Sequence, residues 1–158
     1  MRILSIDPGY ERLGVAILEK NKGQKEMLVF SECFKTSAKL PHNERLALIG
    51  NRIKEIIKKY KPERMATEKL FFSGNQKTAM LVAEARGVIL YSGSSSGLEI
   101  FEYTPNEVKI AITGYGRSEK KQMIDMVKKL IVVDSKKSSD DEFDAIAIGL
   151  THFATERH

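Results

Sequence analysis

The sequence has only one cysteine, Cys33, so the chain cannot form an internal disulfide. A single free thiol fits a reducing compartment such as the cytosol. No apolar run reaches the roughly 18 residues that a membrane-spanning helix needs. The opening segment, Met1–Asp7, is too short and becomes acidic too soon for a signal peptide. These absences predict a cytoplasmic protein that does not enter a membrane.

Internal repeats and linkers are also missing, and a length of 158 residues suits one domain over residues 1–158. The chain carries 26 Lys and Arg against 21 Asp and Glu, a formal net charge of +5. A basic surface around an acidic site would suit a polyanionic substrate that is held by its phosphates. The alternative is an ordinary lysine-rich protein, and charge alone does not decide between them.

Strand-like runs separated by turn signals dominate the first third of the chain. Residues 2–7, 13–19 and 27–35 are expected to form an antiparallel three-stranded meander, because their connections are short. A helix over 43–60 and a strand over 64–68 follow, and the crossover places that strand parallel to one of the meander. The remaining expected elements are a helix over 75–91, a flexible loop over 92–97, a strand over 98–103, and helices that begin after Thr104, over 119–131 and from Ser139 to about 156.

Two capping boxes mark helix starts, one from Thr104 to Glu107 and one from Ser139 to Glu142. On the helix over 43–60, the 3-and-4 spacing of isoleucines gives an inward face, and Arg45 is expected to face outward. Strands followed by alternating helices and strands predict an α/β fold, a mixed five-stranded sheet with helices on both faces.

Acidic residues stand where buried apolar chain is expected. Asp7 ends the first strand, Glu68 ends the fourth, and Asp144 opens the apolar part of the last helix, with Asp141 one turn before it. Adjacent parallel strands end at one edge of a sheet, where open sheets usually place their sites. Residues three apart share a helix face. Gathered carboxylates repel one another unless a cation lies between them, so the pattern predicts a site for hard divalent ions.

Each acid also has a purely structural explanation. Asp7 lies in an Asp-Pro-Gly sequence that commonly forms a turn. Asp140, Asp141 and Glu142 lie in the first turn of a helix, where acids offset the helix dipole. These explanations are weaker for Asp144, which lies deeper in the helix, and weakest for Glu68.

Four carboxylates can hold two Mg²⁺ ions about 3.5–4 Å apart, which activates water for attack on phosphorus and stabilises the departing oxygen. This chemistry needs no protein nucleophile, and Cys33, which is isolated in the sequence, is a poor one.

The acids belong to a set of longer motifs: Ile6-Asp7-Pro8-Gly9 with Gly14, Ala66-Thr67-Glu68-Lys69-Leu70-Phe71, Ala85-Arg86-Gly87, and Asp141-x-x-Asp144-Ala145-x-Ala147-Ile148 with Thr151-His152. In order and over nearly the whole chain, these motifs resemble those of the RuvC Holliday junction resolvases. That resemblance implies a ribonuclease H-like fold, a homodimer, and Mg²⁺-dependent paired nicking of a four-way DNA junction that leaves 5′-phosphate and 3′-hydroxyl ends. Mn²⁺ would be a substitute metal, and RuvA and RuvB would be partners.

By the resemblance, the catalytic and metal-binding acids are Asp7, Glu68, Asp141 and Asp144. Asp140 is an alternative to Asp141, because residues i and i+4 also share a helix face.

Basic and aromatic residues are expected to contact DNA. The resemblance matches Lys109 and Lys120 to functional lysines of the family and Phe71 to an aromatic residue that stacks on bases. Either Phe71 or Phe72 would stack, and the other would anchor the loop to the core. Residue chemistry adds Arg117 and Lys121, which follow a Gly-x-Gly hinge, although they could equally be a solvated helix start. The helix over 75–91 is expected to form the dimer contact, with a buried core helix as the alternative.

Two other functions compete with a junction endonuclease. A phosphotransferase of the actin and sugar-kinase class also opens with an Asp-x-Gly hairpin, although this chain is short for two lobes. A nucleic-acid binding module without catalysis would use the acids only as caps and turns.

Overall fold

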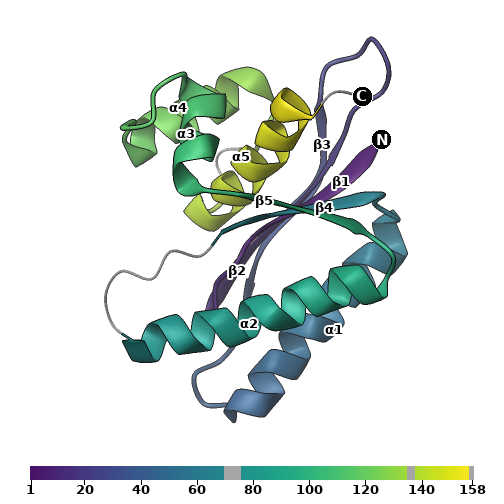
Figure 1. Ribbon diagram of the computed structural model, residues 1–158, viewed down its shortest axis with the longest axis vertical. Coiled ribbons are helices and arrows are strands. Elements are labelled where there is room, and N and C mark those ends of the chain that lie inside the picture. Colours follow the sequence, from purple (N-terminus) through teal and green to yellow (C-terminus); the bar gives the residue numbers. More distant parts are fainter. Residues whose placement is uncertain (70–75, 135–137, 157–158) are drawn as a thin grey trace.

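A mixed five-stranded sheet separates two layers of helices (Figure 1). The computed structural model describes residues 1–69, 76–134 and 138–156. The strand order is β3-β2-β1-β4-β5. The strands are β1 (Arg2–Asp7), β2 (Arg12–Glu19), β3 (Met27–Lys35), β4 (Arg64–Glu68) and β5 (Glu99–Tyr103).

The strand pairing confirms the predicted meander and crossover. Strands β1, β2 and β3 pair antiparallel, whereas β4 pairs parallel with both β1 and β5. In the β1–β4 ladder, Ile6 lies opposite Thr67, so the next residues, Asp7 and Glu68, leave the sheet at the same edge.

Helices α1 and α2 cover one face of the sheet, and α3, α4 and α5 cover the other (Figure 1). In the described parts of the chain, no helix is both long and apolar enough to cross a membrane. The helices are α1 (His42–Tyr60), α2 (Gln76–Ser95), α3 (Pro105–Thr113), α4 (Lys120–Leu130) and α5 (Asp140–Thr155). Both predicted capping boxes, at the starts of α3 and α5, are formed.

The prediction of a flexible loop over 92–97 is wrong, because α2 continues to Ser95. Serine hydroxyls bond back to helix carbonyls there: Ser92 Oγ donates to Val88 O at 2.8 Å, and Ser96 Oγ donates to Ser92 O at 2.7 Å. Gly93 lets the helix pass close to β4, since a Cβ on it would lie 2.7 Å from Met65 Cε. Packing against the sheet thus overrides the loop-like composition.

The prediction that Arg45 faces outward is also wrong, because Arg45 is buried. Its guanidinium carbon lies 3.7 Å from the centroid of the Tyr10 ring, and its Nε donates to Thr36 Oγ1 at 3.0 Å. Tyr10, in the turn after β1, provides the aromatic face, and Thr36, directly after β3, provides the hydroxyl. The periodicity of α1 can reveal neither partner.

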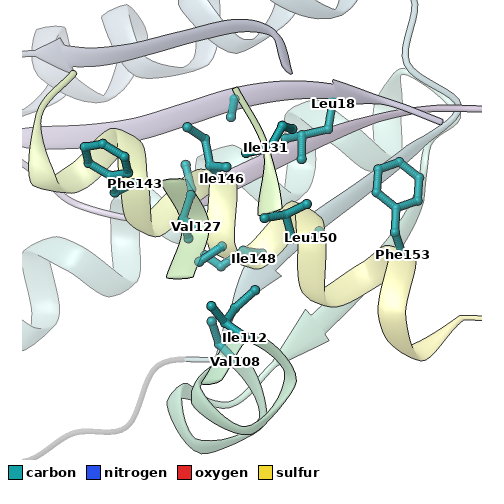
Figure 2. Packing of buried hydrophobic residues seen from close by; sticks show 14 of the residues in the cluster. Leu18, Val108, Ile112, Val127, Ile131, Phe143, Ile146, Ile148, Leu150 and Phe153 are labelled. Atoms are coloured by element: carbon teal, nitrogen blue, oxygen red, sulfur yellow. The ribbon is translucent and has the colours of Figure 1, made fainter. Parts of the chain in front are cut away.

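Helix α5 forms the centre of the second layer and packs on β1 and β2 (Figure 2). Its apolar side chains, including Ile146 and Leu150, are buried with Leu18 of β2 and with Val108 and Ile112 of α3. The close approach requires Gly149, where a Cβ would lie 2.7 Å from Leu18 Cδ1 and 2.8 Å from Ser5 Oγ. This contact fixes the height of α5 above the sheet.

We therefore expect Gly149→Ala to lower the free energy of unfolding by about 1–2 kcal/mol, because overpacking outweighs the gain in helix propensity. Gly87→Ala in α2 is the matched control, since a Cβ there meets no atom within 4 Å. It should raise the free energy of unfolding by up to about 1 kcal/mol. Urea denaturation measures both, and equal stabilisation by the two changes would refute the close packing of α5.

Candidate active site

Three carboxylates from three elements line one pocket at the edge of the sheet. Its volume is about 270 Å³, and its acids are Asp7 at the end of β1, Glu68 at the end of β4 and Asp144 in the second turn of α5. Side chains alternate along a strand, so Asp7 shares the face of Ile3 and Ser5, and Glu68 shares that of Ala66. This is the face that α5 covers. The remaining lining residues are Pro105, Val108, Lys109, Lys120, Met123 and Ile148.

Main-chain contacts bring the start of α5 against the end of β1. Gly14 of β2 pairs with Asp7. A Cβ on Gly14 would lie 2.1 Å from the main-chain oxygen of Asp141 and 3.2 Å from Asp7 Cβ. Only glycine allows this approach, so Gly14 sets the spacing between the acids of α5 and Asp7.

Helix α2 supports the other strand end. Arg86 Nε donates to the main-chain oxygen of Glu68 at 3.4 Å, and the same guanidinium is paired with Glu102 of β5. Lys69 N also donates to Tyr103 O at 2.8 Å, which continues the β4–β5 pairing past Glu68.

Burial and mutual repulsion raise the pKa of all three pocket acids. The pKa of Asp7 rises from an ordinary 3.8 to about 7, mainly because burial removes water from the carboxylate and secondly because Asp144 and Glu68 repel its charge. The pKa of Glu68 is raised by burial and then by Asp144. The pKa of Asp144 is raised by burial, although an ion pair with Lys120 opposes the shift. The fold thus disfavours the ionised forms of these acids, because its own cations do not fully compensate their burial and repulsion.

Two lysines face these acids from α3 and α4. Lys120 Nζ forms an ion pair and hydrogen bond with Asp144 Oδ2, and Lys109 lines the same pocket. Their charges lower the pKa of Glu68, but they do not outweigh its burial.

Asp141 does not line the pocket, although it lies one turn before Asp144. Its Oδ2 accepts hydrogen bonds from Arg12 Nε at 2.9 Å and from Arg12 Nη2, and from Cys33 Sγ at 3.5 Å. Among the charges that raise the pKa of Asp7, that of Asp141 has the smallest effect. Asp140 is exposed and also lies outside the pocket. The sequence did not single out Arg12, whose only signal is its place two residues before Gly14.

The donor set of the pocket fits a hard divalent cation, because all of its acidic groups are carboxylates. Within the described ranges, no three acid, histidine or cysteine side chains stand close enough to hold a metal ion as they are. The ammonium of Lys120 lies on Asp144 instead, and the guanidinium of Arg12 lies on Asp141. Two internal cations thus pair with two of the four predicted metal ligands.

The predicted DNA-binding residues have different positions. Lys109 and Lys120 lie in the pocket, whereas Arg117 and Lys121 are exposed just before and within α4 and do not line it. Phe71 and Phe72 lie outside the described residues.

Comparison with known proteins decides the family. The family model described as "Crossover junction endodeoxyribonuclease RuvC" matches residues 3–152. The chain belongs to the RuvC family. A RuvC from Halothermothrix orenii is 45% identical over 152 residues, which cover 96% of this chain and 92% of that protein. A RuvC from Thermotoga petrophila is 39% identical over 157 residues, which cover 99% and 94%.

Solved structures confirm the ribonuclease H-like fold of this chain. The structure "T. thermophilus RuvC in complex with Holliday junction substrate" matches with a TM-score of 0.90 and 31% identity, over 97% of this chain and 93% of that one. The yeast mitochondrial Holliday junction resolvase Ydc2 matches with a TM-score of 0.69 at 11% identity over 96% and 78%, which shows a shared fold.

The raised pKa of Asp7 predicts how stability depends on pH when no metal is present. Between about pH 4 and pH 7 the folded protein holds a proton on Asp7 that the unfolded chain has released. The free energy of unfolding should therefore fall as pH rises through this window, by about 4 kcal/mol if Asp7 titrated alone. Asp7→Asn should reduce the fall.

Denaturation with a chelator measures this dependence, and Asp125→Asn, at an exposed position of α4, is the control. Adding Mg²⁺ should stabilise the protein more at about pH 8 than at about pH 5, because the ion binds the ionised acids. Stability that rises between about pH 4 and pH 7 in chelator, and is unaffected by Asp7→Asn, would contradict the burial of an ionisable Asp7.

Proposed function

We propose that this chain resolves four-way DNA junctions by metal-assisted hydrolysis of one phosphodiester on each of two opposing strands. The observation that carries the proposal is the pocket that Asp7, Glu68 and Asp144 line together with Lys109 and Lys120. Membership of the RuvC family supports the Holliday junction as the substrate class, and so does the likeness to T. thermophilus RuvC in its complex with a Holliday junction substrate. Both observations favour a nuclease over a phosphotransferase or a binding module.

Asp7, Glu68 and Asp144, with Asp141 turned inward, would hold two Mg²⁺ ions, and Mn²⁺ would substitute. Ions held there would activate water and stabilise the leaving 3′-oxygen, which leaves a 5′-phosphate and a 3′-hydroxyl. The role of the fold is to keep these carboxylates close together and poorly hydrated despite their repulsion.

The lysines of the pocket bind the phosphate that reacts. Lys109 and Lys120 line the pocket together with the acids, so a phosphodiester in the pocket would contact both the cations and the acid cluster. Lys120 exchanges its Asp144 partner for the phosphate when the substrate binds. Arg117 and Lys121 contact phosphates farther along the strand. Phe71 or Phe72 stacks on an unpaired base at the junction.

Two copies of the chain act together, because paired nicks on opposing strands need two sites related by two-fold symmetry. Helix α2 supports a dimer contact, since Met80 and Tyr91 expose 62% and 67% of their surface. RuvA and RuvB would deliver the junction, and the complex would act in the cytoplasm.

Replacing a pocket acid by its amide should abolish nicking and spare binding. Asp7→Asn and Asp144→Asn should each lower the rate of junction cleavage in Mg²⁺ by at least about 100-fold, since metal-dependent transition-state stabilisation is lost. Synthetic junctions resolved on denaturing gels measure the rate, and mobility shift measures binding. Asp125→Asn is the control. Undiminished paired nicks with Asp7→Asn would refute the proposal.

Substitutions of two neighbouring lysines should distinguish a specific contact in the pocket from general electrostatic attraction to DNA. Lys120→Gln should slow single-turnover cleavage by about 10–100-fold, whereas Lys121→Gln, with the same charge change, should slow it less than about threefold. Both should weaken junction binding similarly, because each removes one charge near DNA. Equal effects of the two changes on the cleavage rate would show that Lys120 has no special role in the pocket.

A further inference from the structure

Asp141 is held away from the other acids by a cation of the chain itself. One oxygen of this carboxylate receives hydrogen bonds from Nε and Nη2 of Arg12 and from the thiol of Cys33. Arg12 stands at the start of β2, and Cys33 lies on β3. The contact therefore ties the first turn of α5 to the meander, whereas Lys120 of α4 pairs with Asp144.

The main chain is fixed on both sides of this contact. A Cβ on Gly9 would lie 1.8 Å from the carbonyl oxygen of Arg12, and one on Gly14 would lie 2.1 Å from that of Asp141. The backbones of Arg12 and Asp141 are thus each in close main-chain contact with a glycine that has no room for a side chain. The Asp141 carboxylate can thus change partners only if its own side chain rotates and the Arg12 side chain lets it go.

The Arg12 side chain is free to move in this way. It is 51% exposed, against 23% for that of Asp141, so its guanidinium can be rehydrated when it leaves. Asp141 is on the same helix as Asp144 and one turn away, so a rotated carboxylate would approach the pocket from its α5 side.

We propose that Arg12 is a positioning residue that acts as a latch: it competes with a divalent cation for Asp141 and so keeps the metal affinity of the free protein low. The latch rests on the proposed function only in taking Asp141 as the fourth metal ligand. Release of Arg12 completes the acid cluster, and reattachment of Arg12 disrupts it. The side chain of Arg12 and a bound metal are therefore alternative partners for one carboxylate.

The test is a titration of the full chain with Mn²⁺ in the absence of DNA. The electron paramagnetic resonance signal of the free ion measures how much Mn²⁺ is bound. Arg12→Gln should tighten the weaker Mn²⁺ site by about three- to tenfold, the range that a partly exposed ion pair supports. Arg12→Lys keeps the charge but loses the two-nitrogen contact, so it should give a smaller gain. Arg52→Gln is the matched control, because Arg52 pairs with Glu32 between α1 and β3, with 2.6 Å between Nε and Oε1.

A double substitution distinguishes a latch from a general effect of removing a positive charge near the site. In Asp141→Asn there is no carboxylate to release, so adding Arg12→Gln should change Mn²⁺ affinity by less than about twofold. An unchanged or weaker affinity in Arg12→Gln overturns the latch. A gain that persists in the Asp141→Asn background overturns it as well, because Arg12 would then act only through its charge.

Junction cleavage by the wild-type preparation keeps this test separate from that of the proposed function. If Arg12→Gln tightens Mn²⁺ binding as predicted but the wild-type protein cuts no junction, the nuclease proposal is refuted and the latch stands. If the wild-type protein cuts junctions but Arg12→Gln leaves the Mn²⁺ affinity unchanged, the latch is refuted and the nuclease proposal stands.

Discussion

The burial of the Asp7 carboxylate against the first turns of α5 is the constraint on which the rest of the site depends. Glycines at 14 and 149 let α5 lie so close to β1 and β2 that Asp144 reaches Asp7, while Glu68 arrives from the parallel strand β4. Water is displaced from acids that repel one another, and the pKa of Asp7 rises to about 7. The pairing of Lys120 with Asp144 partly relieves this repulsion, and a divalent cation would relieve it more fully.

One face of the sheet carries the supporting helices, and the other carries the residues of the pocket. Helices α1 and α2 pack on one face through an apolar cluster, and buried contacts such as Arg45 on Tyr10 hold the turn that follows Asp7. The other face carries α5 with its acids, and α3 and α4 with the lysines of the pocket. The backbones that carry the acids are thus closely packed, whereas the cationic groups that pair with the acids sit on long side chains. In the proposals above, these side chains exchange a carboxylate for a phosphate or yield to a metal.

Much of this architecture could be predicted from the sequence, because local signals and the global fold agree. Alternation and short turns predicted the meander, the crossover predicted parallel β4, and the capping boxes at Thr104 and Ser139 predicted the helix starts. The sequence also indicated that Asp7 and Glu68 meet. It could not show that Asp141 turns to Arg12, since two residues on one helix face can still choose different partners across space. The end of α2 was missed because its serines bond within the helix instead of breaking it.

The most direct test of a metal site among the buried acids is a crystal structure of the wild-type chain grown with Mn²⁺, with the ion located by its anomalous scattering. We predict Mn²⁺ among the carboxylates of Asp7, Glu68 and Asp144, with the Lys120 ammonium displaced from Asp144. Anomalous density elsewhere, with Lys120 still paired to Asp144 and the acid pocket free of metal at saturating Mn²⁺, would contradict it.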